Sequence, residues 1–108
     1  FYNLFTDDFV KVKELIVSPG KGLSFQKHYH RSEIWFVSKG SCIVNYSEGK
    51  PEEASENILK KEDLFLIKKE AWHQIVNSND EPCHIIEIQY GDKTTEEDIE
   101  RLYYFEGN

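Results

Sequence analysis

The sequence predicts an all-β protein, folded as a sandwich or barrel of short strands. The chain has 108 residues, a length typical of one domain. From Phe1 to Gly91 it consists of short segments rich in Val, Ile, Phe, Tyr and Trp, and turn residues separate them roughly every 8 to 12 positions. Hydrophobic residues make up 39% and aromatic residues 14% of the chain, which is enough for a real core and unlike a disordered tail.

Each expected strand is a run of apolar and β-favouring residues bounded by turn chemistry. The turns at Pro19-Gly20, Lys39-Gly40 and Gly49 supply residues that accept turn dihedral angles. The polar segment 51–56 is expected to be an exposed loop. In chain order the expected strands are 9–17, 23–30, 33–38, 42–47, 63–68, 72–77 and 83–90.

The last part of the chain is expected to form one short helix, at about 95–104. Thr94 and Glu97 form a capping box, and apolar residues recur at helical spacing within 99–103. The acidic first turn suits the positive end of the helix dipole. We therefore expect a single domain over the whole chain, with this helix on the outside of the sandwich.

Charge and composition exclude several classes of partner. The 13 Lys and Arg against 20 Asp and Glu give a net charge of −7, so neither nucleic acid nor an anionic membrane is expected to bind. No apolar run is long enough to span a membrane. Cys42 and Cys83 lack the spacing of a metal or redox pair, and we expect two free thiols in the cytoplasm, with a single disulfide as the alternative.

A cluster of metal-binding residue types lies at 26–33. Residues two apart on a strand face the same side, so His28 and His30 would present two imidazoles about 6.6 to 7 Å apart at the backbone. Their ring nitrogens could then converge on one cation. His73 could supply a third nitrogen from another strand, and Glu33 an oxygen.

Each of these residues also has an ordinary structural explanation. Two histidines on an exposed strand can be solvated, and His73 alone can be a partly buried histidine. Glu33 alone can be a surface acid. Their joint occurrence at these spacings favours the metal site.

The same residues resemble the first motif of the cupin superfamily, whose fold is a β jelly roll. Gly22, His28, His30, Glu33 and Gly40 match that motif, although only two residues separate His30 from Glu33. Shortening a four-residue gap by two keeps the alternation of the strand, so Glu33 is expected to face the same side as the family glutamate.

The second cupin motif is matched more weakly. His73 and Asn77 are in place, whereas Glu62, Lys68 and Glu70 stand where the family has Gly, Pro and Gly. We expect altered turn geometry near Lys68 to Glu70 and an intact His73 ligand.

A closer resemblance covers nearly the whole chain. It is to the cupin domain of type II mannose-6-phosphate isomerases, which also forms the carboxyl-terminal part of bifunctional GDP-mannose pyrophosphorylases. In this chain Ile34 stands where that family commonly has His. The matching segments are Val12-Lys13, Pro19-Gly20, Leu23-Ser24, Gln26 to Glu33, Ile86 to Gly91 and Glu97 to Arg101.

The resemblance implies an enzyme of the mannose-6-phosphate isomerase type, an intramolecular oxidoreductase that interconverts mannose 6-phosphate and fructose 6-phosphate. It implies one divalent metal ion, with zinc foremost and manganese, cobalt, nickel or iron as alternatives, because a metal stabilises the charge that develops when a proton beside a carbonyl is removed. The implied metal ligands are His28, His30, Glu33 and His73.

Glu33 and Glu87 are the candidates for the catalytic acid or base. Glu87 shares a strand face with Ile85 and Gln89, and the opposite face of 84–90 is more apolar, which favours an outward-facing Glu87. Proton transfer needs a group within about 3 Å of the migrating proton, so Glu87 qualifies only if its face looks inward.

Substrate binding is expected to use Gln26, Arg31 and Lys68. Arg31 offers a planar fork suited to a phosphate, although it could merely pair with a surface acid. Lys27 and Lys69 are second choices.

The segment 35–37 is apolar on both strand faces, which predicts a homodimer. The alternative is that the expected C-terminal helix covers that face.

Two other functions remain open at this stage. One is a metal-dependent cupin that binds a sugar or sugar phosphate without catalysis. The other is a different cupin enzyme such as an iron dioxygenase, because a mixed His and carboxylate site with open positions also suits iron. The fold alone does not discriminate among them.

Overall fold

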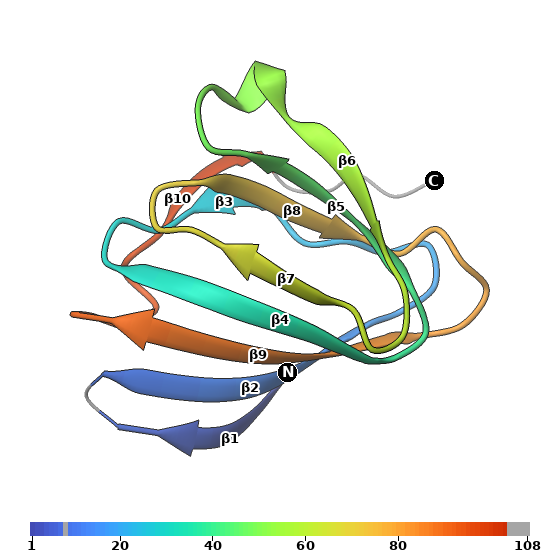
Figure 1. The fold of residues 1–108 in the computed structure, drawn as a ribbon, viewed down its shortest axis with the longest axis horizontal. Helices are drawn as coiled ribbons and strands as arrows, with labels where there is room; N and C mark the ends of the chain where they lie inside the picture. The colour runs from blue at the N-terminus through green and yellow to red at the C-terminus, as the bar shows by residue number, and fades with distance from the viewer. Residues whose placement is uncertain (8, 104–108) are drawn as a thin grey trace.

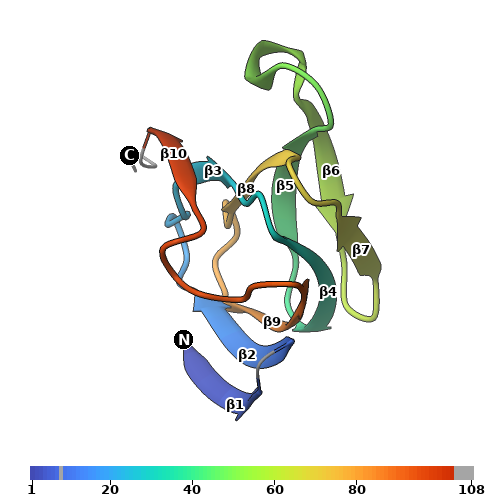
Figure 2. The ribbon, with the colours of Figure 1, turned by 90° about the vertical axis from the view of Figure 1, so that its left-hand side faces the viewer.

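The computed structural model describes residues 1–7 and 9–103. Two five-stranded antiparallel sheets face each other with the core between them (Figures 1 and 2). Sheet A has the strand order β1 (Tyr2–Thr6), β2 (Val10–Val17), β9 (Cys83–Gly91), β4 (Arg31–Lys39) and β7 (Leu64–Ile67). Sheet B has the order β10 (Glu100–Tyr103), β3 (Phe25–Lys27), β8 (Trp72–Val76), β5 (Cys42–Ser47) and β6 (Ser55–Leu59).

The two-sheet jelly-roll architecture confirms the all-β prediction. Residues that alternate along β2, β4, β5 and β9 are buried, as strands with one face on a core require, whereas four consecutive residues of β8 are buried. The buried apolar cluster contains Leu15, Val17, Trp35, Val37, Cys42, Val44, Leu59, Ile67, Ile75, Cys83 and Ile85. Both cysteines are free and buried.

The expected C-terminal helix is wrong. Residues 95–98 form turns, and Glu100–Tyr103 is strand β10, which pairs antiparallel with β3. The Tyr103 ring packs edge-on against Phe25, with 5.5 Å between centroids. The open edge of β3 supplies hydrogen-bond partners that a short isolated helix lacks, so tertiary pairing outweighs the helical spacing. Position 104, the end of the expected helix, lies outside the described residues.

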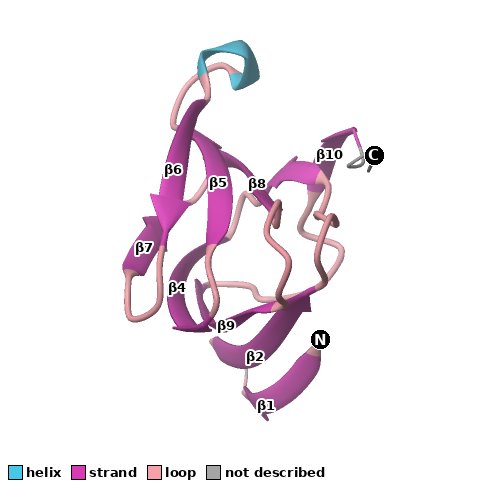
Figure 3. Cartoon of the chain, turned by 90° about the vertical axis from the view of Figure 1, so that its right-hand side faces the viewer, coloured by secondary structure: helices cyan, strands magenta, loops and turns pink. Residues whose placement is uncertain are grey.

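Two further strands were not expected. β1 adds to the edge of sheet A, and β6 occupies part of the segment expected as a loop. The helical segment seen among the described residues is a 3₁₀ turn, η1 (Pro51–Glu53), at the end of the β5–β6 connection (Figure 3).

Two glutamates adopt the left-handed backbone that glycine favours. The φ angle is 77° at Glu62 and 67° at Glu70. The backbone N–H of Glu62 donates to the Val37 carbonyl, and that of Glu70 to the His28 carbonyl, both at 2.7 Å. These are the two positions where the motif has Gly and this chain has Glu. The backbone therefore keeps the left-handed conformation there although the residue is not glycine.

The outer side of sheet A is also apolar. In β4, β7 and β9 the outward positions pair across the sheet, Ile34 with Ile88 and Leu66, and Phe36 with Ile86 and Leu64. Val12 on β2 continues the first row beside Ile88. We call this set the outer apolar face: Val12, Ile34, Phe36, Leu64, Leu66, Ile86 and Ile88. None of the described helical segments is long and apolar enough to cross a membrane.

Candidate metal centre

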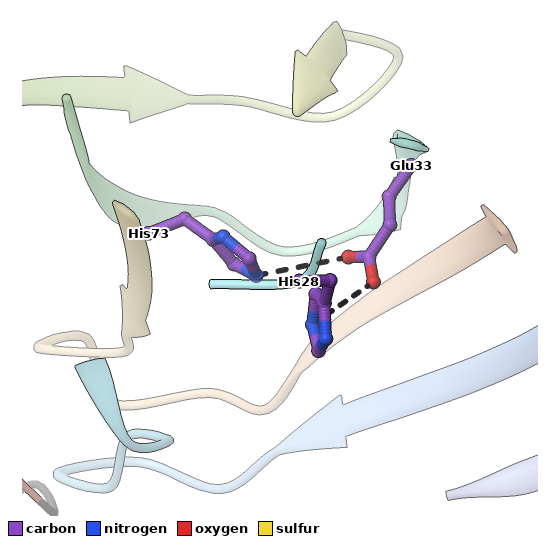
Figure 4. A group of neighbouring side chains, drawn as sticks. All are labelled: His28, Glu33 and His73. Atoms are coloured by element: carbon purple, nitrogen blue, oxygen red, sulfur yellow. Dashed lines mark ion pairs between the residues drawn. The ribbon is translucent and has the colours of Figure 1, made fainter. Parts of the chain in front are cut away.

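Three side chains from different elements meet between the sheets (Figure 4). His28 follows β3, Glu33 lies on β4 and His73 on β8, and all three are buried. One ligand atom from each lies within 4.8 Å of the others. Glu33 Oε2 is 3.4 Å from His28 Nε2, and Glu33 Oε1 is 3.9 Å from His73 Nε2. These are three of the four residues expected as metal ligands.

Backbone carbonyls orient both imidazoles. His28 Nδ1 lies 2.5 Å from the Asp98 carbonyl oxygen, and His73 Nδ1 lies 3.0 Å from that of Ala71. A carbonyl only accepts, so each Nδ1 carries the proton and each Nε2 lone pair faces the cluster. Burial lowers the pKa of His28 to about 3, helped by the Arg31 charge, and burial lowers the pKa of His73 to about 4. Both rings are therefore neutral near pH 7, as metal ligands must be.

The guanidinium of Arg31 donates hydrogen bonds to two of these ligand atoms. Arg31 Nε donates to Glu33 Oε2 at 3.0 Å, and Nη2 donates to His28 Nε2 at 3.1 Å. Two imidazole nitrogens and a carboxylate fit a divalent ion of the zinc or iron kind. Such an ion and this position of Arg31 exclude each other, because both need the same lone pairs.

His30 does not join the cluster. Its side chain is 43% exposed, and its Nδ1 lies 3.5 Å from Asp92 Oδ1. The strand expected over 23–30 ends at Lys27, and residues 29–30 form a bend. The Asp98 carboxylate accepts hydrogen bonds from the backbone N–H groups of Tyr29 and His30 at 2.9 and 2.8 Å. The bend breaks the two-residue alternation, so it turns His30 outward and Arg31 inward.

Glu87 faces inward, contrary to the expectation from strand parity. It is 5% exposed, and the residues buried along β9 are Cys83, Ile85, Glu87 and Gln89. The parity argument chose the more apolar face, but here that face belongs to the outer apolar face of sheet A. Apolar character therefore did not distinguish inside from outside.

Trp35 joins the two acids at the site. Its indole Nε1 lies 3.0 Å from Glu33 Oε1 and 2.9 Å from Glu87 Oε2, and Gln89 Nε2 donates to Glu87 Oε1 at 2.6 Å. Burial raises the pKa of Glu87 to about 8, and the nearby charge of Glu33 adds to the increase. Glu87 is therefore largely protonated near pH 7, beside a second carboxylate.

A cavity of about 150 Å³ adjoins the cluster. Its wall contains the expected residues Gln26, Arg31, Glu33 and Glu87, together with His28 and His73. Lys68 is not part of this wall; its side chain is 59% exposed and its Nζ lies 3.5 Å from Glu48 Oε1.

Several wall residues were not expected from the sequence: Lys13, Trp35, Gln89, Glu96 and Arg101. The one signal at Lys13 was the family resemblance of Val12-Lys13. It was not used for the site, because in 10–13 lysines alternate with valines and the usual interpretation places the lysines in solvent. Asn77 of the second motif has a structural role instead, since its Nδ2 donates to the carbonyls of Val17 and Glu81, both at 2.8 Å.

Sequence comparison identifies the relatives of this chain. The family described as mannose-6-phosphate isomerase C-terminal matches residues 2–104. Mannose-1-phosphate guanylyltransferase 2 of Escherichia coli O157:H7 is 34% identical over 91 residues, which cover 84% of this chain and 18% of that protein. The alginate biosynthesis protein AlgA of Pseudomonas aeruginosa is 35% identical over 92 residues, covering 85% and 18%. The chain thus spans less than a fifth of these curated relatives.

Solved structures share the fold. A Klebsiella pneumoniae protein with a double-stranded β-helix domain superposes with a TM-score of 0.76 at 19% identity, over 92% of this chain and 79% of that one. A sugar phosphate isomerase of the cupin superfamily from Silicibacter pomeroyi gives a TM-score of 0.65 at 19% identity, over 76% and 50%. These likenesses confirm the predicted cupin jelly roll.

The expectation of an enzyme of the mannose-6-phosphate isomerase type is corrected by these findings. The relatives whose names state a reaction are named for guanylyl transfer rather than isomerisation, and the matching region is a small part of each. The findings support the cupin fold and a carbohydrate-related family. They do not assign to this chain the isomerase activity in the family's description. Because the family match runs along nearly the whole chain, this chain belongs to the mannose-6-phosphate isomerase C-terminal family.

Proposed function

We propose that this domain binds a sugar phosphate at a divalent metal centre held by His28, Glu33 and His73. One observation carries the proposal: two imidazoles, each with its Nδ1 proton committed to a carbonyl, turn their Nε2 atoms toward one buried carboxylate beside a cavity. When bound, the ion would polarise a sugar oxygen. The donor set favours zinc, with iron, cobalt, manganese and nickel as alternatives.

Arg31 is expected to serve the phosphate once the ligand atoms are taken by a metal. Its guanidinium would then lose its contacts with His28 and Glu33 and would remain at the cavity wall. A planar fork with free N–H groups suits the oxygens of a phosphate. Gln26, on the same wall, can hydrogen-bond a sugar hydroxyl.

Glu87 contributes a hydrogen bond at this site. In the metal-free chain its carboxyl group is largely protonated and can donate to a sugar oxygen, and Trp35 and Gln89 hold it in place. The catalytic role expected for Glu33 and Glu87 stays a prediction.

Calorimetric titration with fructose 6-phosphate tests the proposal. We expect the zinc-loaded protein to bind fructose 6-phosphate, and we expect binding to weaken at least tenfold when the metal is removed by a chelator or when fructose replaces the phosphate ester. Binding that does not depend on the metal would contradict the proposal.

Solvent-deuterium exchange into the bound sugar, followed by NMR, distinguishes binding from catalysis. A binding module leaves the sugar protons in place, and exchange would show chemistry beyond binding. Oxygen uptake by iron-loaded protein would instead favour the dioxygenase alternative.

We also propose that two copies of the chain associate through the outer apolar face. The support is an apolar row across β2, β9, β4 and β7, beside a second row that is apolar on β9, β4 and β7 and has Glu14 on β2. In these rows Leu64 is 67% exposed and Leu66 46%. β10 does not cover this face, because β10 pairs in sheet B. Light scattering after size exclusion should show a dimer, and a monomer at micromolar concentration would contradict this.

The free thiols support a reducing compartment such as the cytoplasm.

A further inference from the structure

Lys13 is a buried ammonium group at the cavity wall. It lies on the inward face of β2 and is 4% exposed. Lysine is rarely buried without a partner, because its charge must be compensated. Its Nζ lies 2.6 Å from Glu96 Oε1 and 3.9 Å from the centre of the Phe1 ring. The compensating anion is therefore Glu96.

Glu96 comes from the segment that joins the two sheets. Residues 92–99, which we call the strap, run from β9 to β10 across one end of the sandwich (Figure 2). The Glu96 side chain is 61% exposed, yet its Oε1 also lies 3.2 Å from Lys11 Nζ. One carboxylate on a surface segment is thus held by two ammonium groups of β2. Rotating it into water would cost little, because most of it is already solvated.

The same cavity contains a second sign of a ligand. Gln89 is 1% exposed and lines the cavity, its Nε2 donates to Glu87, and among the described residues its Oε1 has no hydrogen-bond partner. A buried acceptor without a donor costs free energy unless a ligand or water satisfies it. A sugar hydroxyl is a donor of the right kind.

We infer that Lys13 binds the phosphate group of a phosphate monoester, and that Glu96 occupies this anion position until the ligand displaces it. The inference deepens the proposed function and rests on it for the sugar part of the ligand. A carboxylate brings one negative charge to the lysines, whereas a phosphate ester brings up to two and three terminal oxygens. Lys13 and Arg31, both in the cavity wall, could each take one of those oxygens, and Gln89 Oε1 would accept a bond from a hydroxyl of the same ligand.

Two variants and one matched control test this inference. Lys13→Met keeps an unbranched side chain one atom shorter and removes its charge, and Glu96→Gln removes the competing charge. The control is Glu97→Gln, which makes the same change at an exposed neighbour on the strap that does not line this cavity. The probes are inorganic phosphate and fructose 6-phosphate, titrated by calorimetry into the full chain with and without zinc, after thermal melting shows that each variant is folded.

We expect Glu96→Gln to tighten phosphate binding about tenfold, Lys13→Met to weaken it at least tenfold, and Glu97→Gln to change it less than about twofold. Equal affinities for the two glutamine variants, or a Lys13→Met protein that binds as the wild type does, would overturn the inference. Failure of Glu96→Gln to bind phosphate at all would also overturn it. The titration without zinc distinguishes the two proposals. If fructose 6-phosphate binds equally well with and without zinc, the proposed metal-dependent function fails. A phosphate site at Lys13 would still be supported, because it does not need the metal.

Discussion

The inner face of sheet A has two halves with opposite chemistry. Toward one end, Leu15 pairs with Ile85 and Ile85 with Val37, so three apolar side chains form a row across β2, β9 and β4. Two residues along the same strands, the row consists of Lys13, Glu87 and Trp35, and the next contains Lys11, Gln89 and Glu33. The strands and the sheet are the same, and only the side chains differ.

This comparison shows how a small domain positions a polar site. The apolar row packs against sheet B and fixes the positions of the strands. The side chains two residues further along each strand face the same side, so their positions are fixed as well. Buried lysine, glutamate and glutamine lower stability relative to apolar residues, and such a cost is usual where a site is built into a fold. The apolar half should therefore control folding and the polar half binding.

The largest expected effect on stability comes from the apolar half. Ile85→Ala should lower the free energy of unfolding by about 2 to 5 kcal/mol, because it leaves a cavity in the middle of the row. Urea unfolding measures this loss. Ile58→Ala, at a mostly exposed position on β6, is the matched control and should change stability far less. Similar losses for both variants would remove the distinction between core and surface.

The largest expected effect on binding comes from the polar half. His73→Ala should lower zinc affinity by about a hundredfold or more, because it removes one of three converging ligands. Metal analysis after dialysis against a zinc buffer measures it. His30→Ala is the control and should keep its metal, since His30 lies outside the cluster. Loss of metal in the control as well would place His30 in the site.

The pH dependence of stability should separate Glu87 from the histidines. The pKa of Glu87 is about 8 in the folded chain against an ordinary 4.5, so between those values the folded state binds more protons and stability falls as pH rises. The lowered pKa values of His28 and His73 act oppositely, raising stability with pH up to about 6.5. Between pH 6.5 and 8, Glu87→Gln should therefore flatten the decline in Tm, and an unchanged slope would show that Glu87 is already ionised.

The smallest expected effect lies in the turns that flank the site. Glu70→Gly should stabilise the fold by about 1 kcal/mol, because a φ of 67° is costly for any residue with a Cβ and natural for glycine. Chemical denaturation measures the change. Lys69→Gly, one residue earlier and without positive φ, is expected to lower stability slightly. A loss of stability at both positions would mean that the left-handed turn carries no strain.

Much of the fold could be predicted from the sequence. The strand 42–47 was predicted with the bounds that the structure has, and 83–90 within one residue, because turn residues on both sides bound runs with strong β propensity. β1 and β10 are both edge strands that were missed. The partner of β10 is β3, far back in the chain, whereas β1 forms a hairpin with the next strand, β2. Propensity alone does not show such partners.

The candidate site could be predicted in part. The residue types and spacing at 28, 33 and 73 were sufficient to bring three candidate ligands together, because they lie on segments whose positions the fold restricts. His30 was misplaced because a bend stabilised by Asp98, an acid 68 residues further along the chain, interrupts the alternation. Lys13 was missed because its charge is compensated by Glu96, 83 residues away.

By itself, therefore, the sequence determined that the chain forms strands, roughly where they lie, and which groups could hold a metal. Only the tertiary structure decided which side of each strand faces inward. Alternation distinguishes two faces but does not say which is inside, and in sheet A both faces carry apolar residues. The cavity wall contains Glu87, Gln89 and Lys13 because sheet B and the strap pack against the side of sheet A that carries them.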